Sequence, residues 1–299
     1  MKRRLLCALV PLLSFVLVGC SSQASGATGS SDSKSPTSST SSQTPDKLVI
    51  GMEVNYAPFN WSETTSSEFT LPVSNHAGSY ADGYDIQIAK LLAEKTGMEV
   101  SIFQSDWDAL IPNLIAGTIN AVIAGMTDTA ERELSIDFTD EYYHSELVLL
   151  TKKSVADSYS SAISSADFKA FATGKMFVSQ NDTVTDDVIS EKFVTYGAIH
   201  NNAVADFATA ALSVSTGAAF AMTAELPVAQ SLVNSFTSLG IVHIDQAILG
   251  DLYASLGVSI GLKKGSSSLQ TSLNSALKEI SADTRLSLME GALTRSASI

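Results

Sequence analysis

Short apolar runs typical of β-strands alternate with segments of helical period from residue 47 onward. The strand-like runs are residues 47–53, 98–104 and 119–126, and the helix-like segments are residues 84–97 and 107–117. A second set of the same kind follows between residues 175 and 280. This order predicts an α/β protein with a largely parallel sheet, because parallel strands are joined by crossover connections that are usually helices.

The segment YDIQIAKLLAEKTG (residues 84–97) carries the helical signal most clearly. Its apolar side chains Ile88, Leu91 and Leu92 recur at helical spacing. We expect Asp85 to cap the N-terminus of this helix and Gly97 to follow its last turn.

The first 20 residues have the pattern of an export signal. A basic start is followed by an apolar stretch, residues 5–18, that is too short to span a membrane. The stretch ends in Leu17-Val18-Gly19-Cys20, which resembles the lipobox of bacterial lipoproteins, where the cysteine is lipidated and becomes the first mature residue. We therefore expect residues 1–19 to be a lipoprotein signal peptide. The alternative is an ordinary signal peptide, or a membrane helix, that contains a cysteine.

Residues 21–46 contain no aromatic residue and no Val, Ile, Leu or Met. Such a segment buries too little apolar surface to offset its ordering entropy. Together with lipidated Cys20 we expect it to form a disordered tether with a reach of roughly 25–30 Å. The folded part would then work at the extracellular face of a cell membrane, as in a Gram-positive bacterium.

Charge and cysteine content exclude several classes of function. The formal net charge is −13, and removal of residues 1–19 takes away Lys2, Arg3 and Arg4 but no acid, which moves it to −16. A surface this acidic argues against nucleic acid as a partner. Cys7 lies in the signal segment, so no internal disulfide is expected. The four histidines lack metal-ligand spacing, and we expect neither a metal nor a cofactor.

Four motifs follow one another in the chain, and together they resemble polar amino-acid-binding proteins, the solute receptors of ABC importers. They are GMEVNYAPFNW (51–61), ADGYDIQIAKLLAEKTG (81–97), DWDALIPNLIAGTINAVIAGMTDTAER (106–132) and IDFTDEYY (136–143). The resemblance covers residues 47–290.

The resemblance implies a fold as well as a function. It is the two-lobed periplasmic-binding-protein-like fold of type II, in which two α/β lobes joined by two hinge strands close on a ligand. The implied lobes are residues 47–150 with 254–299, and residues 151–253. The implied hinge strands lie near residues 148–154 and 250–257.

The run AGMTDTAER (124–132) suits an anion. It has the form of a strand end, a turn at Gly125 and a helix start, where Asp128 and Glu131 fit a capping box. Backbone N–H groups at a helix start favour negative charge, and the guanidinium of Arg132 offers two parallel donors to a carboxylate.

Within the resemblance, Arg132 and Thr127 bind the ligand α-carboxylate and the Gly125 carbonyl accepts from the α-ammonium group. The alternative for Arg132 is a surface side chain beside Glu131 and Glu133.

The aromatic residues Tyr56 and Trp107 lie on strand-to-helix loops. The resemblance implies that they clamp the ligand side chain by stacking or by cation–π contact. Core packing is the alternative for any aromatic, and we expect it for Phe59 and Phe138. Trp61 is left undecided.

Two acids complete the implied set. Glu53 ends the first strand and would contact the ligand side chain, the alternative being a solvated acid at a strand end. Glu225 precedes a helix and would hold the α-ammonium group, the alternative being a charge that the helix dipole stabilises.

The second-lobe loop VSQNDTVTDD (178–187) departs from the family pattern. Asn181-Asp182-Thr183 replaces a glycine turn, but Asn and Asp tolerate unusual turn dihedrals. Gln180 and Thr183 are still expected at the site. The Asp182 carboxylate would be unfavourable near a bound carboxylate unless it points away.

These residues predict a monomeric, lipid-anchored receptor that passes a free L-amino acid to an ABC permease. The acids Glu53 and Asp182, with no matched Lys or Arg near the side-chain pocket, favour a cationic ligand or glutamine over an acidic one. Two other functions stay open: a ligand-sensing surface module, and a dehydratase of the prephenate or arogenate type, although we expect no enzyme. The segment 62–82 is longer than in relatives and either shades the cleft or forms a surface hairpin.

Overall fold

The structure, a computed structural model, describes residues 46–297, except for the side chains of residues 253–255. The expected signal peptide, Cys20 and most of the tether lie outside the described residues. In the described part, no helix has both the length and the apolar character needed to cross a membrane.

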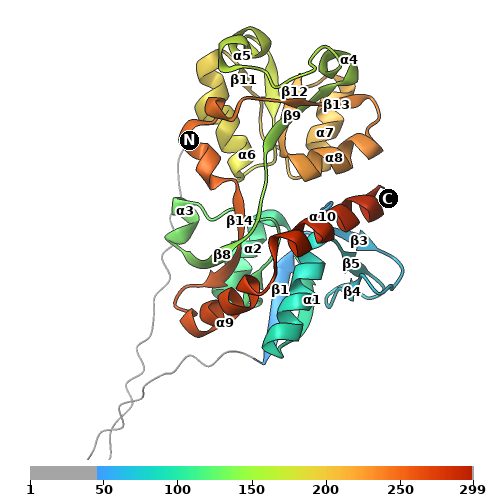
Figure 1. Ribbon diagram of the computed structural model, residues 1–299, viewed down its shortest axis with the longest axis vertical. Coiled ribbons are helices and arrows are strands. Elements are labelled where there is room, and N and C mark those ends of the chain that lie inside the picture. Colours follow the sequence, from blue (N-terminus) through green and yellow to red (C-terminus); the bar gives the residue numbers. More distant parts are fainter. Residues whose placement is uncertain (1–45, 298–299) are drawn as a thin grey trace, which may run out of the picture. The chain divides into compact units, whose positions relative to one another are not determined.

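The first five-stranded sheet has the strand order β6-β1-β7-β14-β8. Its strands β1, β14 and β8 are labelled in Figure 1. Its strands are β1 (Lys47–Met52), β6 (Glu99–Gln104), β7 (Ala121–Val122), β8 (Ile136–His144) and β14 (Gly257–Lys263). The helices in this half of the fold are α1 (Tyr84–Thr96), α2 (Trp107–Ala116), α3 (Ala130–Glu133), α9 (Ser267–Lys278) and α10 (Ala282–Ser296). Strand β1 pairs parallel with β6 and β7, whereas β14 pairs antiparallel with β7 and β8.

The second five-stranded sheet has the order β11-β10-β12-β9-β13. Its strands are β9 (Leu147–Lys152), β10 (Met176–Val178), β11 (Ile199–His200), β12 (Ala221–Glu225) and β13 (Leu239–His243). The helices of this half are α4 (Lys153–Ala156), α5 (Ser165–Ala172), α6 (Val184–Asp187), α7 (Phe207–Thr216) and α8 (Leu226–Ser235). Short π and 3₁₀ turns cover Val188–Lys192, Phe193–Tyr196, Gln246–Ile248 and Gly250–Ser255.

Both sheets are mixed, which corrects the expectation of a largely parallel arrangement. The chain leaves the first sheet along β8 and returns along β14, and these two strands pair antiparallel. In the second sheet, β9 pairs antiparallel with both β12 and β13. All of β9 belongs to the second sheet, so the chain first passes from one sheet to the other at Ser145–Glu146.

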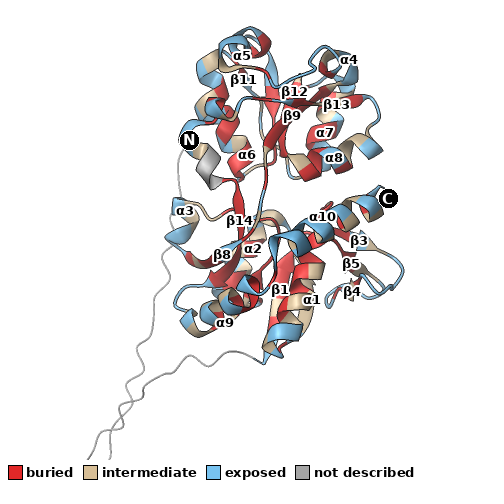
Figure 2. Cartoon of the chain, in the orientation of Figure 1, coloured by how far each residue is buried: buried red, intermediate tan, exposed pale blue. Residues whose placement is uncertain are grey.

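Buried residues run continuously along the central strands (red in Figure 2). Strands β7 and β12 are buried at every position, and β9 and β14 at every position but the last. Continuous burial of this kind is typical of strands that are covered on both faces. The strand ends are thereby held rigidly, and the loops that follow them carry the candidate site.

Helix α1 ends as expected but begins differently. Gly97 has φ 74° and follows the last turn, which confirms its predicted place. The N-cap is Gly83, not Asp85. A Cβ at Gly83 would lie 2.1 Å from the Phe59 carbonyl oxygen, so only glycine fits there. The Asp85 side chain is instead fully buried.

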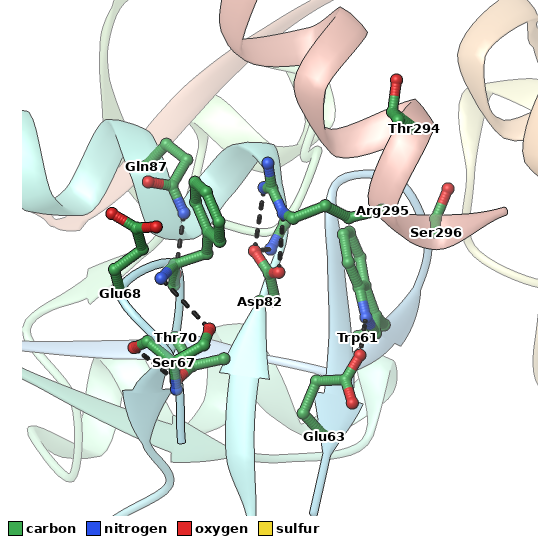
Figure 3. A network of polar contacts seen from close by, with 12 residues as sticks. Trp61, Glu63, Ser67, Glu68, Thr70, Asp82, Gln87, Thr294, Arg295 and Ser296 are labelled. Carbon is green, nitrogen blue, oxygen red and sulfur yellow. Dashed lines mark hydrogen bonds and ion pairs between the residues drawn. The ribbon is translucent and has the colours of Figure 1, made fainter. Parts of the chain in front are cut away.

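The long segment 62–82 forms a surface hairpin. It adds to a four-stranded sheet of order β2-β3-β5-β4, made of β2 (Asn55–Tyr56), β3 (Asn60–Glu63), β4 (Leu71–Pro72) and β5 (Tyr80–Asp82). Arg295 of α10 anchors it (Figure 3): its Nε and Nη2 donate to the two carboxylate oxygens of Asp82 at 2.8 and 2.9 Å. The same guanidinium lies 4.3 Å from the ring centroid of Phe69 and 5.9 Å from that of Trp61.

Candidate ligand-binding site

The structure brings all nine predicted ligand-binding residues together around one small cavity of about 20 Å³. They are Glu53, Tyr56, Trp107, Gly125, Thr127, Arg132, Gln180, Thr183 and Glu225. Val184 and Phe207 complete the lining, and no residue of the segment 62–82 takes part in it. The cavity is therefore lined by residues from both halves of the fold, the half with the first five-stranded sheet and the half with the second. That these residues bind a ligand remains a prediction.

Arg132 joins the two halves. Its Nη1 donates to the Thr127 carbonyl at 2.7 Å and its Nη2 to the Asp182 carbonyl at 2.6 Å. The guanidinium lies 5.3 Å from the ring centroid of Trp107, whose Nε1 also donates to the Asp182 carbonyl at 3.2 Å. The Arg132 side chain therefore packs between the two halves, and it is not a surface side chain beside Glu131 and Glu133.

The helix start at Arg132 is capped by a different residue than expected. Thr129, not Asp128, is the N-cap of α3, because its hydroxyl accepts from the Arg132 backbone N–H at 3.3 Å. Burial lowers the pKa of the Arg132 guanidinium, whereas Asp187, Asp182 and Glu131 raise it. The group stays cationic, since an arginine is not deprotonated in a protein. A cation whose partners are neutral carbonyls can exchange them for a carboxylate.

Two other pairs of residues in the cavity lining are hydrogen-bonded between the halves. The Tyr56 hydroxyl donates to Glu225 Oε2 at 2.6 Å. The Gln180 amide donates to Glu53 Oε1 at 3.0 Å and to the Ala205 carbonyl at 2.8 Å. Each contact pairs a donor on one side with an acceptor on the other, so a ligand with groups of both kinds could bind in their place.

Both acids are buried. Glu53 is 6% exposed, which excludes a solvated acid at the strand end. Burial raises the pKa of Glu53 to about 7; the Gln180 hydrogen bond lowers it, and Asp206, Asp106 and Asp108 raise it further. Burial also raises the pKa of Glu225, which the hydrogen bond from Tyr56 opposes. Glu225 is also the N-cap of α8, so it lies at the positive end of a helix dipole, as the alternative for this residue assumes.

In the Asn181-Asp182-Thr183 turn, the middle residue has a left-handed backbone conformation, which glycine adopts readily. Asp182 has φ 55°, in the left-handed region that aspartate tolerates better than most residues. Its carboxylate lies near the Asn181 amide, 3.4 Å away, and its carbonyl faces Arg132. The Thr183 hydroxyl accepts from the Asp186 N–H at 3.3 Å and so caps α6.

The ring of Tyr56 is packed between two phenylalanines. Phe59 lies stacked at 5.3 Å and Phe207 tilted at 4.8 Å between ring centroids. Gly125, with φ 61°, approaches the same ring, and a Cβ there would lie 2.8 Å from Tyr56 Cε1. Phe59 and Phe138 belong to the core, as expected. Trp61 packs with the hairpin and does not line the cavity.

Sequence reasoning missed Val184 and Phe207. Phe207 is the first residue of α7, whose N-cap is Asp206. The sequence signal that could have identified Phe207 is its place directly after the helix cap Asp206, because the first residue of a helix lies next to the loop that precedes it. Val184 has no comparable signal.

Two larger cavities share lining residues with the small one. One of about 290 Å³ includes Trp107 and Arg132. The other, of about 240 Å³, includes Glu53 and Trp107 together with Asp106, Asp108 and Asp206. The side of the site that Glu53 occupies is therefore strongly acidic.

Residues 48–290 match the family of bacterial extracellular solute-binding proteins, family 3. The chain belongs to this family. ABC transporter arginine-binding protein 1 of Escherichia coli (strain K12) is 26% identical over 80% of the chain and 86% of that protein. ABC transporter glutamine-binding protein GlnH of Bacillus subtilis (strain 168) is 25% identical over 95% of the chain and 94% of that protein. The match to Arginine-binding extracellular protein ArtP of the same organism is 30% identical but spans only about half of each, 51% of the chain and 49% of that protein.

Solved structures confirm the two-lobed fold of family 3. An arginine-bound amino-acid ABC transporter substrate-binding protein from Streptococcus pneumoniae aligns with a TM-score of 0.66 at 21% identity, over 84% of the chain and 96% of that protein. An ancestral arginine-binding protein bound to arginine aligns with a TM-score of 0.65 at 25% identity, over 83% of the chain and 99% of that protein. The relatives named here are binding proteins and not enzymes, in agreement with the expectation that the chain is not an enzyme.

Proposed function

We propose that the chain is the lipid-anchored substrate-binding component of an ABC importer, and that it captures one L-amino acid by closure of its lobes. The observation that carries this proposal is the set of contacts across the cavity. Arg132 and Trp107 meet the Asp182 carbonyl, Tyr56 meets Glu225, and Gln180 meets Glu53.

An amino acid has groups that suit these positions. Its α-carboxylate would bind Arg132 beside Thr127. Its α-ammonium group would bind Glu225 and the Gly125 carbonyl. Its side chain would pass between Tyr56 and Trp107 toward Glu53 and Gln180.

We further propose a cationic amino acid as the ligand, with glutamine as a weaker one. Glu53 and the three aspartates around it favour a positive side-chain end. The names of the relatives agree, since they include arginine-binding and glutamine-binding proteins.

A thermal-shift screen with the twenty L-amino acids tests the proposal. A ligand at 100 times its dissociation constant adds about 2.7 kcal/mol to the stability of the folded state. For a domain of this size that corresponds to a rise in Tm of roughly 5–10 °C. Agmatine, which is arginine without its carboxylate, is the matched control and should give little shift. If none of the twenty raises Tm, the proposal fails.

The lipid anchor is tested separately at Cys20. After labelling with radioactive fatty acid, the wild-type protein should sediment with membranes and carry the label, whereas the Cys20→Ala variant should carry none, whether it is released or retained with an uncleaved signal. Equal labelling of the two proteins would remove Cys20 as the anchor.

A further inference from the structure

Asp85 is a fully buried carboxylate that does not line the cavity. The Tyr142 hydroxyl donates to its Oδ1 at 2.8 Å, and the Asn60 amide donates to its Oδ2 at 2.9 Å. Both of these partners are themselves fully buried. The Asn60 NH₂ group can only donate, and the Tyr142 hydroxyl, which accepts from the Gly125 N–H, gives its own proton to Asp85, so the direction of each hydrogen bond is set.

Each of these two partners also accepts a hydrogen bond from a backbone N–H group. The Tyr142 hydroxyl, whose proton points to Asp85, accepts from the Gly125 N–H at 3.0 Å. The Asn60 carbonyl oxygen, whose NH₂ group points to Asp85, accepts from the Val54 N–H at 2.8 Å. One carboxylate therefore determines the hydrogen bonding of two separate turns.

The two turns share an unusual backbone. Val54 has φ 60° and Gly125 has φ 61°. For a β-branched residue such as valine the left-handed region is a genuine outlier, so the surrounding structure has to hold it. Val54 directly follows Glu53, and the turn at Gly125 packs against the ring of Tyr56.

We propose that Asp85 is a positioning residue, which holds the Val54 and Gly125 turns so that Glu53, Tyr56 and the Gly125 carbonyl face one ligand. This inference rests on the proposed function, since the ligand is the amino acid proposed above. Asp85 itself would not touch that ligand. Its effect would pass through Asn60 and Tyr142.

The hydrogen-bond inventory predicts what an amide does in this place. If Asn at position 85 accepts from Tyr142, its NH₂ group faces the NH₂ group of Asn60. Rotation of the Asn60 amide relieves that conflict but turns its NH₂ group toward the Val54 N–H. Whichever way the amides turn, one donor is left without an acceptor.

The test compares Asp85→Asn with the two single-branch variants Tyr142→Phe and Asn60→Ala, all as purified full chain. Leu92→Ala is the matched control, because Leu92 is a fully buried residue on the same helix with no part in the network. Hydrogen exchange of the Val54 and Gly125 amides is measured by NMR without ligand. L-arginine affinity is measured by calorimetry at a temperature where every variant is folded.

We expect Tyr142→Phe to speed exchange of the Gly125 amide alone and Asn60→Ala that of the Val54 amide alone. Asp85→Asn should speed at least one of the two and weaken L-arginine binding about tenfold or more. Leu92→Ala should lower Tm but leave Kd within about threefold, because its cost is a core cavity. Unchanged exchange at both amides in Asp85→Asn, or an unchanged Kd, would overturn the inference. Failure of the wild-type protein to bind any of the twenty amino acids would refute the proposed function, whereas the exchange measurements still test the Asp85 network, since they need no ligand.

Discussion

Replacing Arg132 by lysine tests the carboxylate site most directly. Lysine keeps the positive charge but has a single ammonium group in place of the planar fork. In the structure the two terminal nitrogens of Arg132 reach different acceptors, Thr127 and Asp182, and the guanidinium lies against Trp107. A lysine at this position can meet one of the two acceptors but not both.

The magnitude follows from the geometry of the fork. Against a bound carboxylate, lysine makes one charge-assisted hydrogen bond fewer than arginine, which is worth about 1.5–3 kcal/mol. The contact with Trp107 contributes about 0.5–1 kcal/mol more. The variant should therefore bind its amino acid about 2–4 kcal/mol more weakly, which is roughly a 30- to 1000-fold increase in Kd.

Calorimetric titration with L-arginine measures the change, and Arg285→Lys is the matched control. Arg285 also donates only to backbone carbonyls, those of Ile280, Glu141 and Leu277, but it lies outside the cavity lining. It should lower Tm and leave Kd unchanged. A Kd within threefold of wild type for Arg132→Lys would show that Arg132 does not bind the carboxylate.

Three further predictions concern pH, the second-lobe turn and the hairpin. The pKa of Glu53 is raised to about 7, and a cationic side chain binds its ionised form. The ratio of arginine to glutamine affinity should therefore fall up to about 100-fold from pH 8 to pH 5. A constant ratio in calorimetric titrations would exclude Glu53 as a contact of the ligand side chain. Because Asp182 has φ 55°, Asp182→Ala should lower the free energy of unfolding by about 1 kcal/mol, whereas Asp182→Gly should leave it within about 0.5 kcal/mol of wild type. Denaturant unfolding measures both changes, and equal effects would contradict the prediction. Arg295→Lys should cost about 1–2 kcal/mol of stability with no change in Kd, and a changed Kd would link the hairpin to the site.

Most residues of the cavity lining were predicted because four motifs in order resemble a known family, which assigns a position to each of them. Only the run 124–132 could be interpreted from its own chemistry, as a turn and helix start followed by an arginine. The same logic found Gly97, whose φ of 74° follows from its place after a helix. Periodicity likewise gave α2 and β6 nearly to the residue.

Other features could not be predicted because they depend on contacts distant in sequence. Strand β8 has exposed polar residues among its apolar ones and forms a strand because it pairs with β14, more than a hundred residues later. Helix α10 was not predicted either; it packs against α1 and α8, and its Arg295 pairs with Asp82, more than two hundred residues earlier. Asp85 has the sequence signature of a helix cap, and only its burial with Asn60 and Tyr142 gives it another role.

The charges around the cavity agree with the proposed preference for arginine and the weaker binding proposed for glutamine. Its lining contains one cation, Arg132, and two acids, Glu53 and Glu225. In the proposed complex, the α-carboxylate of any amino acid neutralises Arg132 and its α-ammonium group neutralises Glu225. The charge of Glu53 is then the one that the ligand side chain has to neutralise. A cationic side chain neutralises it when it is ionised. Glutamine does not, but with a pKa of about 7 Glu53 can take up a proton near neutral pH at a cost of about 1 kcal/mol or less. An acid with an ordinary pKa would impose several times that cost, so the burial of Glu53 sets how strictly the side chain is selected.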